Sequence, residues 1–227
     1  GIASEVKQFE TTLSMSYFPG RKMTGFGVER YDANDDYSRL FAQVSFGDKS
    51  VFNGDFDYTK VQLSYLQPWQ IGGFGRLYST VEVGKTYGEV PLGLLSVVPG
   101  NQSYFSIYNT FSQLDFYEFV TDTYASLHLE HNFNGRFFSR IPWLRKLNLR
   151  EIVSFRTVWG EVSDANKALN ASGLIYSAPD KEMYYEYSFG VGNIFKVFRL
   201  DFNFRGNYLS NPDARKFGVT GTFGFHF

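Results

Sequence analysis

Long stretches of the chain alternate between two kinds of residue with a period of two, and this alternation limits the fold more than any other feature. From Arg199 to Tyr208, charged or amide side chains occupy every second position and Leu, Phe, Gly or Tyr occupy the others. Residues 217–227 repeat the pattern, with Phe, Val or Gly alternating with Gly, Thr or His. A period of two is typical of a β-strand with two different faces. The alternation therefore predicts a sheet that separates a polar from an apolar environment.

Nine such segments follow one another along the chain, and each exceeds ten residues. Strands of soluble proteins are usually about five or six residues long, whereas a tilted membrane-spanning strand needs about 9 to 11. The lengths favour a membrane barrel over a soluble β-sandwich. We therefore predict an all-β fold, an antiparallel transmembrane β-barrel region that occupies residues 1–227 as one unit. The segments are residues 7–18, 38–48, 56–67, 74–86, 117–132, 147–160, 181–193, 196–209 and 215–227.

The polar positions of these segments collect charges of both signs. A charged side chain is costly in hydrocarbon, but in a barrel lumen it can be solvated or paired with an opposite charge. The predicted lumen-facing charges are Lys60, Arg76, Glu82, Asp122, His128, Glu130, Arg150, Arg156, Glu186, Arg199, Asp201 and Arg205.

The links between segments alternate in length. Short links at residues 193–195 and 66–74 are expected on one side of the barrel, and long links at residues 87–116 and 162–182 on the other. Outer-membrane barrels have short periplasmic turns and long extracellular loops. Counting back nine strands from a periplasmic C-terminus places the start of the first strand outside. An odd number of strands is therefore expected upstream, so that the chain would be the C-terminal part of a larger barrel.

Two observations leave alternatives open for this topology. A further strand at residues 24–31 would make the strand number even and remove the argument. The first residues show neither an initiator methionine nor a signal peptide, so a processed product and a fragment are both compatible with the sequence.

Composition excludes several classes of function. The formal net charge of −1 gives no field that attracts phosphate backbones, which argues against a nucleic-acid partner. The absence of cysteine excludes disulfides, thiolate metal sites and cysteine nucleophiles. The most apolar stretch, residues 90–98, is far shorter than the ~20 residues that a spanning helix needs.

The histidines do not suggest an enzyme. His128 and His131 face opposite sides of one predicted strand and cannot jointly bind a metal. His128 shares its face with Ser126 and Glu130, which superficially resemble the nucleophile and orienting acid of a triad. Neighbours on one strand face are about 7 Å apart, so such a triad needs partners from other strands. We predict no catalytic residue, no cofactor and no metal site; for a barrel hydrolase, His128, Glu130 and Asp122 are the best candidates.

Two connections carry unusual apolar residues. The loop at residues 88–105 is predicted to be extracellular, where exposed apolar side chains are an aggregation hazard unless something covers them. We expect this loop either to fold over the barrel mouth as a lid, which is the preferred interpretation, or to form an interface with a partner. The residues concerned are Val90, Leu92, Leu94, Leu95, Val97 and Val98.

The second connection, residues 135–147, interleaves cations with bulky apolar side chains. Such a segment suits a membrane interface, where aromatic rings lie among headgroups and cations lie near lipid phosphates. An ordinary long turn, interrupted by Pro142, is the alternative. The candidate membrane-interface residues are Arg136, Phe137, Phe138, Arg140, Trp143, Arg145 and Lys146.

Several motifs resemble a known family. The alternating C-terminus, with Phe223, Phe225 and Phe227, resembles the signal read by the outer-membrane insertion machinery. The motifs VPLGLL (90–95), PGNQSY (99–104), YEFVTD (117–122), LEHNFNG (129–135), RIPWLRKL (140–147) and GNIFKVFR (192–199) are similar to the C-terminal region of Bacteroidota outer-membrane proteins. These relatives are known as carboxypeptidase-like regulatory-domain-containing proteins and have no known function. The resemblance spans residues 7–227.

The resemblance implies a periplasmic β-sandwich ahead of a barrel that is itself similar to the outer-membrane assembly-factor superfamily. The family name does not indicate peptidase activity, because it refers to the sandwich, which this sequence does not contain. The expected role is non-catalytic, in outer-membrane protein biogenesis or transport, as a subunit of a larger complex. The expected partners are outer-membrane lipids, lipopolysaccharide and other barrel proteins or lipoproteins. A passive or gated pore and an outer-membrane barrel hydrolase are the alternatives.

Overall fold

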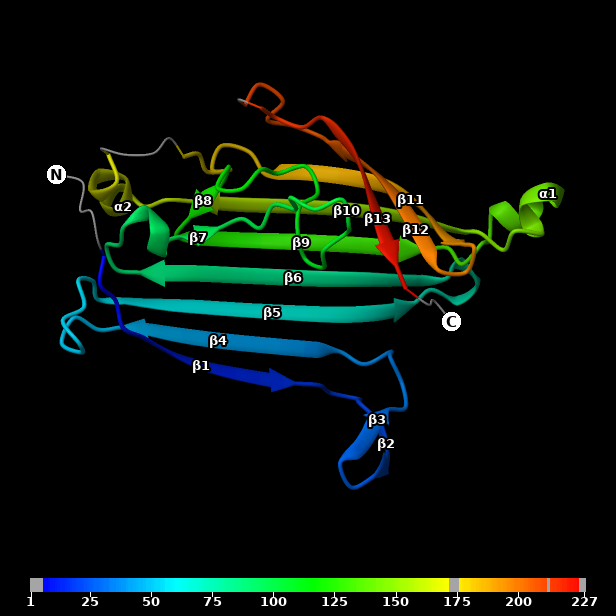
Figure 1. Ribbon diagram of the computed structural model, residues 1–227, viewed down its shortest axis with the longest axis horizontal. Coiled ribbons are helices and arrows are strands. Elements are labelled where there is room, and N and C mark those ends of the chain that lie inside the picture. Colours follow the sequence, from blue (N-terminus) through cyan, green and yellow to red (C-terminus); the bar gives the residue numbers. More distant parts are fainter. Residues whose placement is uncertain (1–5, 172–175, 212, 225–227) are drawn as a thin grey trace.

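The computed structural model of the chain describes residues 6–171, 176–211 and 213–224. Its main feature is one antiparallel sheet of nine strands, in which each strand pairs with the next along the chain (Figure 1). Each predicted segment overlaps one of these strands, so the all-β prediction is confirmed. From one edge to the other, the strands are β1 (Glu10–Tyr17), β4 (Arg39–Gly47), β5 (Tyr58–Gln70), β6 (Arg76–Tyr87), β9 (Thr123–Asn132), β10 (Arg150–Glu161), β11 (Tyr184–Ile194), β12 (Phe198–Arg205) and β13 (Phe217–Phe223).

Some strands are shorter than the alternation predicts. β1 and β12 have 8 residues each and β4 has 9, although the predicted segments all exceed ten. The predicted segments were too long there, because the alternation of polar and apolar residues continues into the flanking connections, where the backbone no longer pairs with another strand. β13 ends at Phe223 after 7 residues. Phe225 and Phe227 of the predicted insertion signal lie outside the described residues.

The sheet does not close on itself within the part of the chain that the structure describes. β1 and β13 form its two edges, and no ladder joins them. Eight antiparallel steps separate the two strands, so they run in the same direction. The structure therefore establishes a nine-stranded antiparallel sheet with two open edges, and the larger barrel of which it was predicted to be a part stays a prediction.

Smaller elements lie in the connections. β2 (Met23–Phe26) and β3 (Glu29–Asp32) form a separate hairpin, so the further strand considered at residues 24–31 does not join the main sheet. β7 (Ser96–Val97) pairs with β8 (Val120–Thr121). None of the helices in the described residues is long and apolar enough to span a membrane. They are η1 (Gly72–Phe74), η2 (Leu92–Leu94), η3 (Phe138–Arg140), α1 (Pro142–Arg145) and α2 (Asp164–Leu169).

The two ends of the sheet carry different connections, as the link lengths predict. The short turns at residues 71–75 and 195–197 lie at one end, together with the connection that contains α1 (Figure 1). The long connections, residues 88–119 and 162–183, lie at the other end. Two connections are exceptions in length. The connection 18–38 places the hairpin at residues 23–32, and the connection 133–149 places η3 and α1, at the end with the short turns.

One face of the sheet is polar. Residues that pair across antiparallel strands point to the same side. A row that crosses β6, β9, β10, β11 and β12 therefore lies on one face, which we call the polar face. The row is Thr80, His128, Arg156, Glu186 and Arg205.

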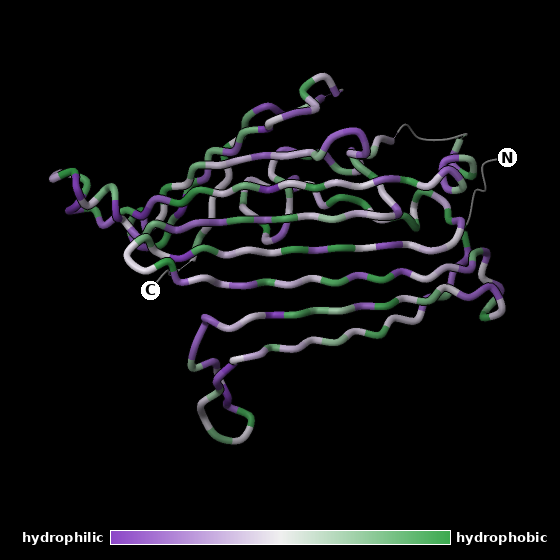
Figure 2. The backbone as a smooth tube through the Cα atoms, turned by 180° about the vertical axis from the view of Figure 1, so that it is seen from behind, coloured by the Kyte–Doolittle hydropathy of each residue, from purple (hydrophilic) through white to green (hydrophobic). Residues whose placement is uncertain are grey.

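The opposite face, which we call the apolar face, presents large apolar side chains. The row Leu63, Val83, Ala125 and Trp159 crosses four strands on this side. Figure 2 shows the resulting alternation of polar and apolar positions along the strands. All strands except β9 contribute exposed large apolar residues, among them Leu13, Met15, Phe46, Val61, Tyr65, Trp69, Val81, Val153, Phe155, Tyr187, Phe189, Leu200, Val219 and Phe223.

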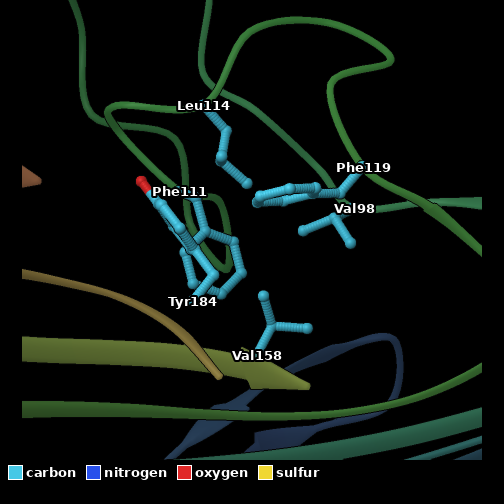
Figure 3. Packing of buried hydrophobic residues seen from close by; sticks show 6 residues of the cluster. All are labelled: Val98, Phe111, Leu114, Phe119, Val158 and Tyr184. Carbon is cyan, nitrogen blue, oxygen red and sulfur yellow. The ribbon is translucent and has the colours of Figure 1, made fainter. Parts of the chain in front are cut away.

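The buried apolar core lies on the polar side of the sheet, between the strands and the long connections. In one cluster the rings of Phe111 and Phe119 pack against Tyr184 of β11, with centroids 5.6 Å and 5.4 Å away (Figure 3). Val158 of β10 forms the base of this cluster. A second cluster contains Tyr58, Val90, Leu95, Val120 and Val162. Both clusters attach the connection between β6 and β8 to the sheet.

Replacement of Phe111 tests this core. We expect Phe111→Ala to lower the free energy of unfolding by about 3 to 5 kcal/mol, because it removes a fully buried ring and leaves a cavity. Tyr104→Ala is the matched control in the same connection, since Tyr104 is 89% exposed, and its effect should stay within about 0.5 kcal/mol. Denaturant titration measures both values. Equal stability of the two variants would contradict the packing.

Candidate functional site

Residues 88–119, which connect β6 to β8, lie on the polar face of the sheet (Figure 1), and we call them the covering segment. At its far reach, Phe105 forms a parallel bridge with Gly221 of β13. The N–H of Gly221 donates to the carbonyl of Tyr104, and the N–H of Ser106 donates to the carbonyl of Gly221. The donor–acceptor distance is 2.8 Å in both hydrogen bonds. The covering segment therefore occupies part of the free edge of β13.

Glu186 of β11 is the central anchor of the covering segment. Its side chain is fully buried, and its two carboxylate oxygens accept the backbone N–H groups of Ser112 and Gln113, at 2.7 and 2.9 Å. Arg156 and the hydroxyl of Tyr184 also donate to this carboxylate, both at 3.2 Å. A buried carboxylate is costly unless charge and hydrogen bonds compensate it. Here two of the compensating donors belong to the covering segment, so the charge of Glu186 favours its docking.

Arg205 of β12 and Glu118 of the covering segment form a second anchor. Two guanidinium nitrogens of Arg205 donate to the two carboxylate oxygens of Glu118, at 2.6 and 3.0 Å. This is the bidentate geometry typical of an arginine–carboxylate pair. The Arg205 side chain is fully buried. It also donates to the carbonyl of Gln113 at 3.3 Å. Both buried charges therefore depend on contacts between the sheet and the covering segment.

The surroundings of Glu118 favour its ionised form. Burial by itself favours the neutral carboxyl, but hydrogen bonds from Arg205, from Asn211 and from the backbone of Asp115 outweigh this effect. The pKa of Glu118 is therefore lower than its ordinary value. The negative charge of Glu118 therefore helps to hold the covering segment against Arg205 of the sheet.

A third anchor lies on β6. The carboxylate of Glu82 accepts hydrogen bonds from Gln62 of β5 at 3.0 Å, from Tyr124 of β9 at 2.8 Å and from Asn109 of the covering segment at 3.0 Å. Nearby, the hydroxyls of Thr80 and Tyr108 lie 3.1 Å apart. The covering segment thus contacts charged or polar groups across the width of the sheet.

A further group of ion pairs is formed by strand residues alone. Arg199 of β12 donates to both oxygens of Glu130 on β9, at 2.9 and 2.7 Å, and also pairs with Asp201 at 2.8 Å. Ser106 of the covering segment lies 2.9 Å from the hydroxyl of Thr220. Arg199 therefore joins two strands that are not neighbours in the sheet, across the space on its polar side.

Helix α2 holds the beginning of the covering segment. Asn166 accepts the N–H of Val90 at 2.9 Å and donates to Asp122 at 3.0 Å. Asn170, one helical turn later, accepts the N–H of Leu92 at 2.8 Å. Asp122 lies just before β9 and also accepts the N–H of Ser163 at 2.7 Å. These side chains connect both long connections at this end of the sheet.

Several of these residues were missed by the sequence analysis. Glu118, Asn109, Asn166 and Asn170 were not among the predicted site residues. A spacing of four between Asn166 and Asn170 is compatible with one helix face, which is the only local signal for the pair. Glu118 lies inside the YEFVTD motif, but nothing local identifies Arg205 as its partner.

The remaining predicted charges lie apart from these anchors. Lys60 is 3.7 Å from Glu10 of β1, and Arg76 pairs with Asp35 of the connection before β4. Arg150 lies at the end of the sheet that carries α1, where it lines a cleft. The twelve predicted charges therefore form several local groups, of which those around Glu186, Arg205 and Glu82 contact the covering segment.

The residues considered for catalysis do not assemble into a triad. His128 packs against the ring of Phe111, with centroids 4.8 Å apart, and no hydrogen bond between described residues joins it to Ser126. Glu130 is held by Arg199, and Asp122 is bound at the end of the strand by Ser163 and Asn166. Within residues 6–171, 176–211 and 213–224, no three His, Asp or Glu side chains are grouped as a metal site requires.

The covering segment leaves space on the polar face. A cavity of about 330 Å³ is bordered by Tyr78, Tyr108, Arg156 and Arg199, among others. Another, of about 310 Å³, lies between Glu82, Phe111 and their neighbours. The polar side of the sheet is thus occupied but not filled.

The apolar loop residues pack inside the chain. Val90, Leu95 and Val98 are buried, and Leu92, Leu94 and Val97 pack against the second core cluster. The chain itself therefore covers these side chains, and the role of the loop as a lid or as an interface stays a prediction.

The segment 135–147 projects beyond the end of the sheet as η3 and α1 (Figure 1). Arg136 is fixed to the turn between β5 and β6, because its guanidinium lies 4.1 Å from the ring centroid of Phe74 and donates to the carbonyl of Gly73 at 2.6 Å. Phe137 and Trp143 are exposed. Phe138 and Arg140 belong to η3, and Arg145 and Lys146 to the end of α1.

Comparison with known protein families shows which family the chain belongs to. A family model described as the C-terminal domain of a family of unknown function, DUF5686, matches residues 3–191. This agrees with the resemblance to the C-terminal region of a family without known function. No curated protein matches the chain.

The lowered pKa of Glu118 predicts a pH dependence. A carboxyl whose pKa is lower in the folded state contributes stability above its ordinary value of 4.5, and this contribution is lost as the pH falls through the folded pKa. We expect the chain to be more stable than its Glu118→Gln variant at neutral pH. The difference should shrink once the pH is lowered below the ordinary value. Denaturant titrations at several pH values measure it, and a difference that does not change with pH would contradict the assignment.

Proposed function

Because the chain belongs to the C-terminal domain of the DUF5686 family, whose function is unknown, we propose its function from its geometry. It forms the wall of a transmembrane β-barrel in a bacterial outer membrane, with the apolar face toward lipid and the polar face toward a lumen. Its role there is non-catalytic, in outer-membrane protein biogenesis or transport, as a subunit of a larger complex.

The apolar face is the observation that carries this proposal. Large apolar side chains are exposed on eight of the nine strands, from Leu13 on β1 to Phe223 on β13. A soluble monomer rarely exposes so extended an apolar surface. An outer-membrane barrel presents such a band to lipid and keeps polar residues inside. β5, β6 and β9 to β11, with 10 to 13 residues each, also meet the ~9 to 11 residues that a spanning strand needs.

The open edge of β1 extends the proposal. In hydrocarbon, backbone N–H and C=O groups without partners are costly, so a spanning sheet has to close. β1 pairs only with β4 among the described strands. We propose that further strands complete the barrel, and that this chain supplies its C-terminal part.

The covering segment supports a regulated role over a passive pore. It lies on the face that borders the proposed lumen and is held by Glu186, Arg205 and Glu82. Passage of a substrate through such a lumen requires the segment to move. A gated pore is the second candidate, favoured by the cavities of about 330 and 310 Å³ beside the segment.

Fluorescence quenching tests the membrane assignment. In a Trp143→Phe variant the remaining tryptophans are Trp69 and Trp159, both on the apolar face. In bilayers of lipid brominated along the acyl chains, we expect their emission to be quenched, because the two rings contact hydrocarbon. The matched control replaces Trp69 and Trp159 by Phe and leaves Trp143, for which we expect weaker quenching. Emission from Trp69 and Trp159 that is quenched by iodide in water and not by brominated lipid would contradict the proposal.

Conductance tests the role of the covering segment. For the full-length protein in planar bilayers, we expect the unmodified form to be closed most of the time. Glu118→Gln combined with Glu186→Gln should raise the open fraction, because it removes two carboxylates that hold the segment. Glu29→Gln with Glu161→Gln removes two exposed carboxylates and serves as the control. A steady open current from the unmodified protein would favour a passive pore, and equal behaviour of the two double variants would contradict the anchoring role.

A further inference from the structure

A cleft of about 600 Å³ lies at the end of the sheet that carries α1, between the connection 133–149 and the turn after β11. Three cations line it: Arg145 from the end of α1, Arg150 from the start of β10 and Lys196 from the turn between β11 and β12. Side chains from three separate elements thus place positive charge around one hollow.

The charge of the cleft is not compensated by neighbouring carboxylates. No Asp or Glu is among the residues that line it. Within the described part of the chain, Arg145, Arg150 and Lys196 form no ion pair. Glu151, next in sequence to Arg150, is engaged elsewhere, because its carboxylate accepts the backbone N–H of Phe138. The cleft therefore attracts an anion.

The walls of the cleft are held together before any ligand binds. The side-chain amide of Asn193 donates to the carbonyl of Asn148 at 2.7 Å, which joins the end of β11 to the connection 133–149. Asn134, Asn148 and Asn193 all line the cleft and all adopt positive φ, between 51° and 61°. This backbone conformation marks tight turns, in which asparagine is favoured. A preformed site loses less conformational entropy on binding.

Apolar side chains surround the cations. Leu144 and Leu149 line the cleft itself. Trp143 is 69% exposed and Phe195, in the same turn as Lys196, is 87% exposed. Aromatic rings beside cations are typical of the membrane interface, where rings lie among headgroups and cations meet lipid phosphates.

We propose that this cleft binds the phosphate group of a phospholipid in the leaflet at this end of the sheet. Arginine donates several N–H groups in a geometry that matches phosphate oxygens, and lysine adds a point charge. Leu144 and Leu149 then contact the apolar part of the same lipid. The inference rests on the proposed membrane function. A free phosphate ion accounts for the cations but not for the exposed rings of Trp143 and Phe195.

The test compares two double variants of the full-length protein. Arg145→Gln with Lys196→Gln removes two cations of the cleft, whereas Arg30→Gln with Lys181→Gln removes two exposed cations elsewhere that do not line it. Each pair changes the net charge equally. Binding of short-chain phosphatidylglycerol is measured by native mass spectrometry, in a non-ionic detergent without phosphate groups. We expect the apparent Kd to rise about tenfold in the cleft variant and to stay unchanged in the control.

Two further measurements distinguish a failure of the proposed lipid site from a failure of the proposed membrane function. Equal lipid binding by both variants would overturn the cleft as a lipid site. Inorganic phosphate that binds the cleft as tightly as the lipid, and displaces it, would assign the site to a free anion and overturn the lipid. Quenching by brominated bilayers, measured on the same variants, reports insertion independently of the cleft. If a protein that does not bind lipid at the cleft is still quenched by brominated lipid, the lipid site is wrong but the proposed membrane function stands. If brominated lipid quenches none of the variants, both the membrane function and the lipid site are wrong.

Discussion

Buried charge on the polar face is the constraint on which the rest of the structure depends. Glu186 and Arg205 face each other across β11 and β12 and are both buried, and a buried charge is strongly destabilising when a partner is removed. The strands alone supply only part of what these groups need. The covering segment supplies two backbone N–H groups to Glu186 and the carboxylate of Glu118 to Arg205. The sheet and the segment are therefore one folding unit.

The same arrangement explains why the apolar core is on the polar side of the sheet. Phe111, Leu114 and Phe119 of the covering segment pack close to the charged anchors, with Tyr184 and Val158 beneath them. Burial of these rings excludes water from the neighbouring ion pairs, and the ion pairs hold the rings in register. The opposite face is left with large apolar side chains and no covering element among the described residues. In the proposed membrane setting, lipid takes that place.

The two ends of the sheet have different chemistry. At one end the long connections and α2 close over the strands through amide and carboxylate contacts, such as those of Asn166 with Val90 and Asp122. At the other end, short turns leave the strand ends accessible, and the connection with α1 adds cations and exposed rings. In the proposed membrane, the two ends of the sheet face its two different surfaces. The proposed phospholipid site follows from the second end.

Strand positions and faces were predictable from the sequence, because the alternation of side chains is a property of each extended segment by itself. Arg199, Asp201 and Arg205 were placed on one face by their spacing, and the registers agree. A strand at residues 24–31 was considered from the sequence, but its division into the β2–β3 hairpin depends on which backbone groups find partners. The same is true of the shorter ends of β1, β4 and β12, which alternation did not reveal. The pairing of Glu118 with Arg205, 87 residues apart, and the bonds of Asn166 and Asn170 to the covering segment needed the tertiary structure. Local sequence determines which way a side chain points, but only the packing of distant segments decides what it meets.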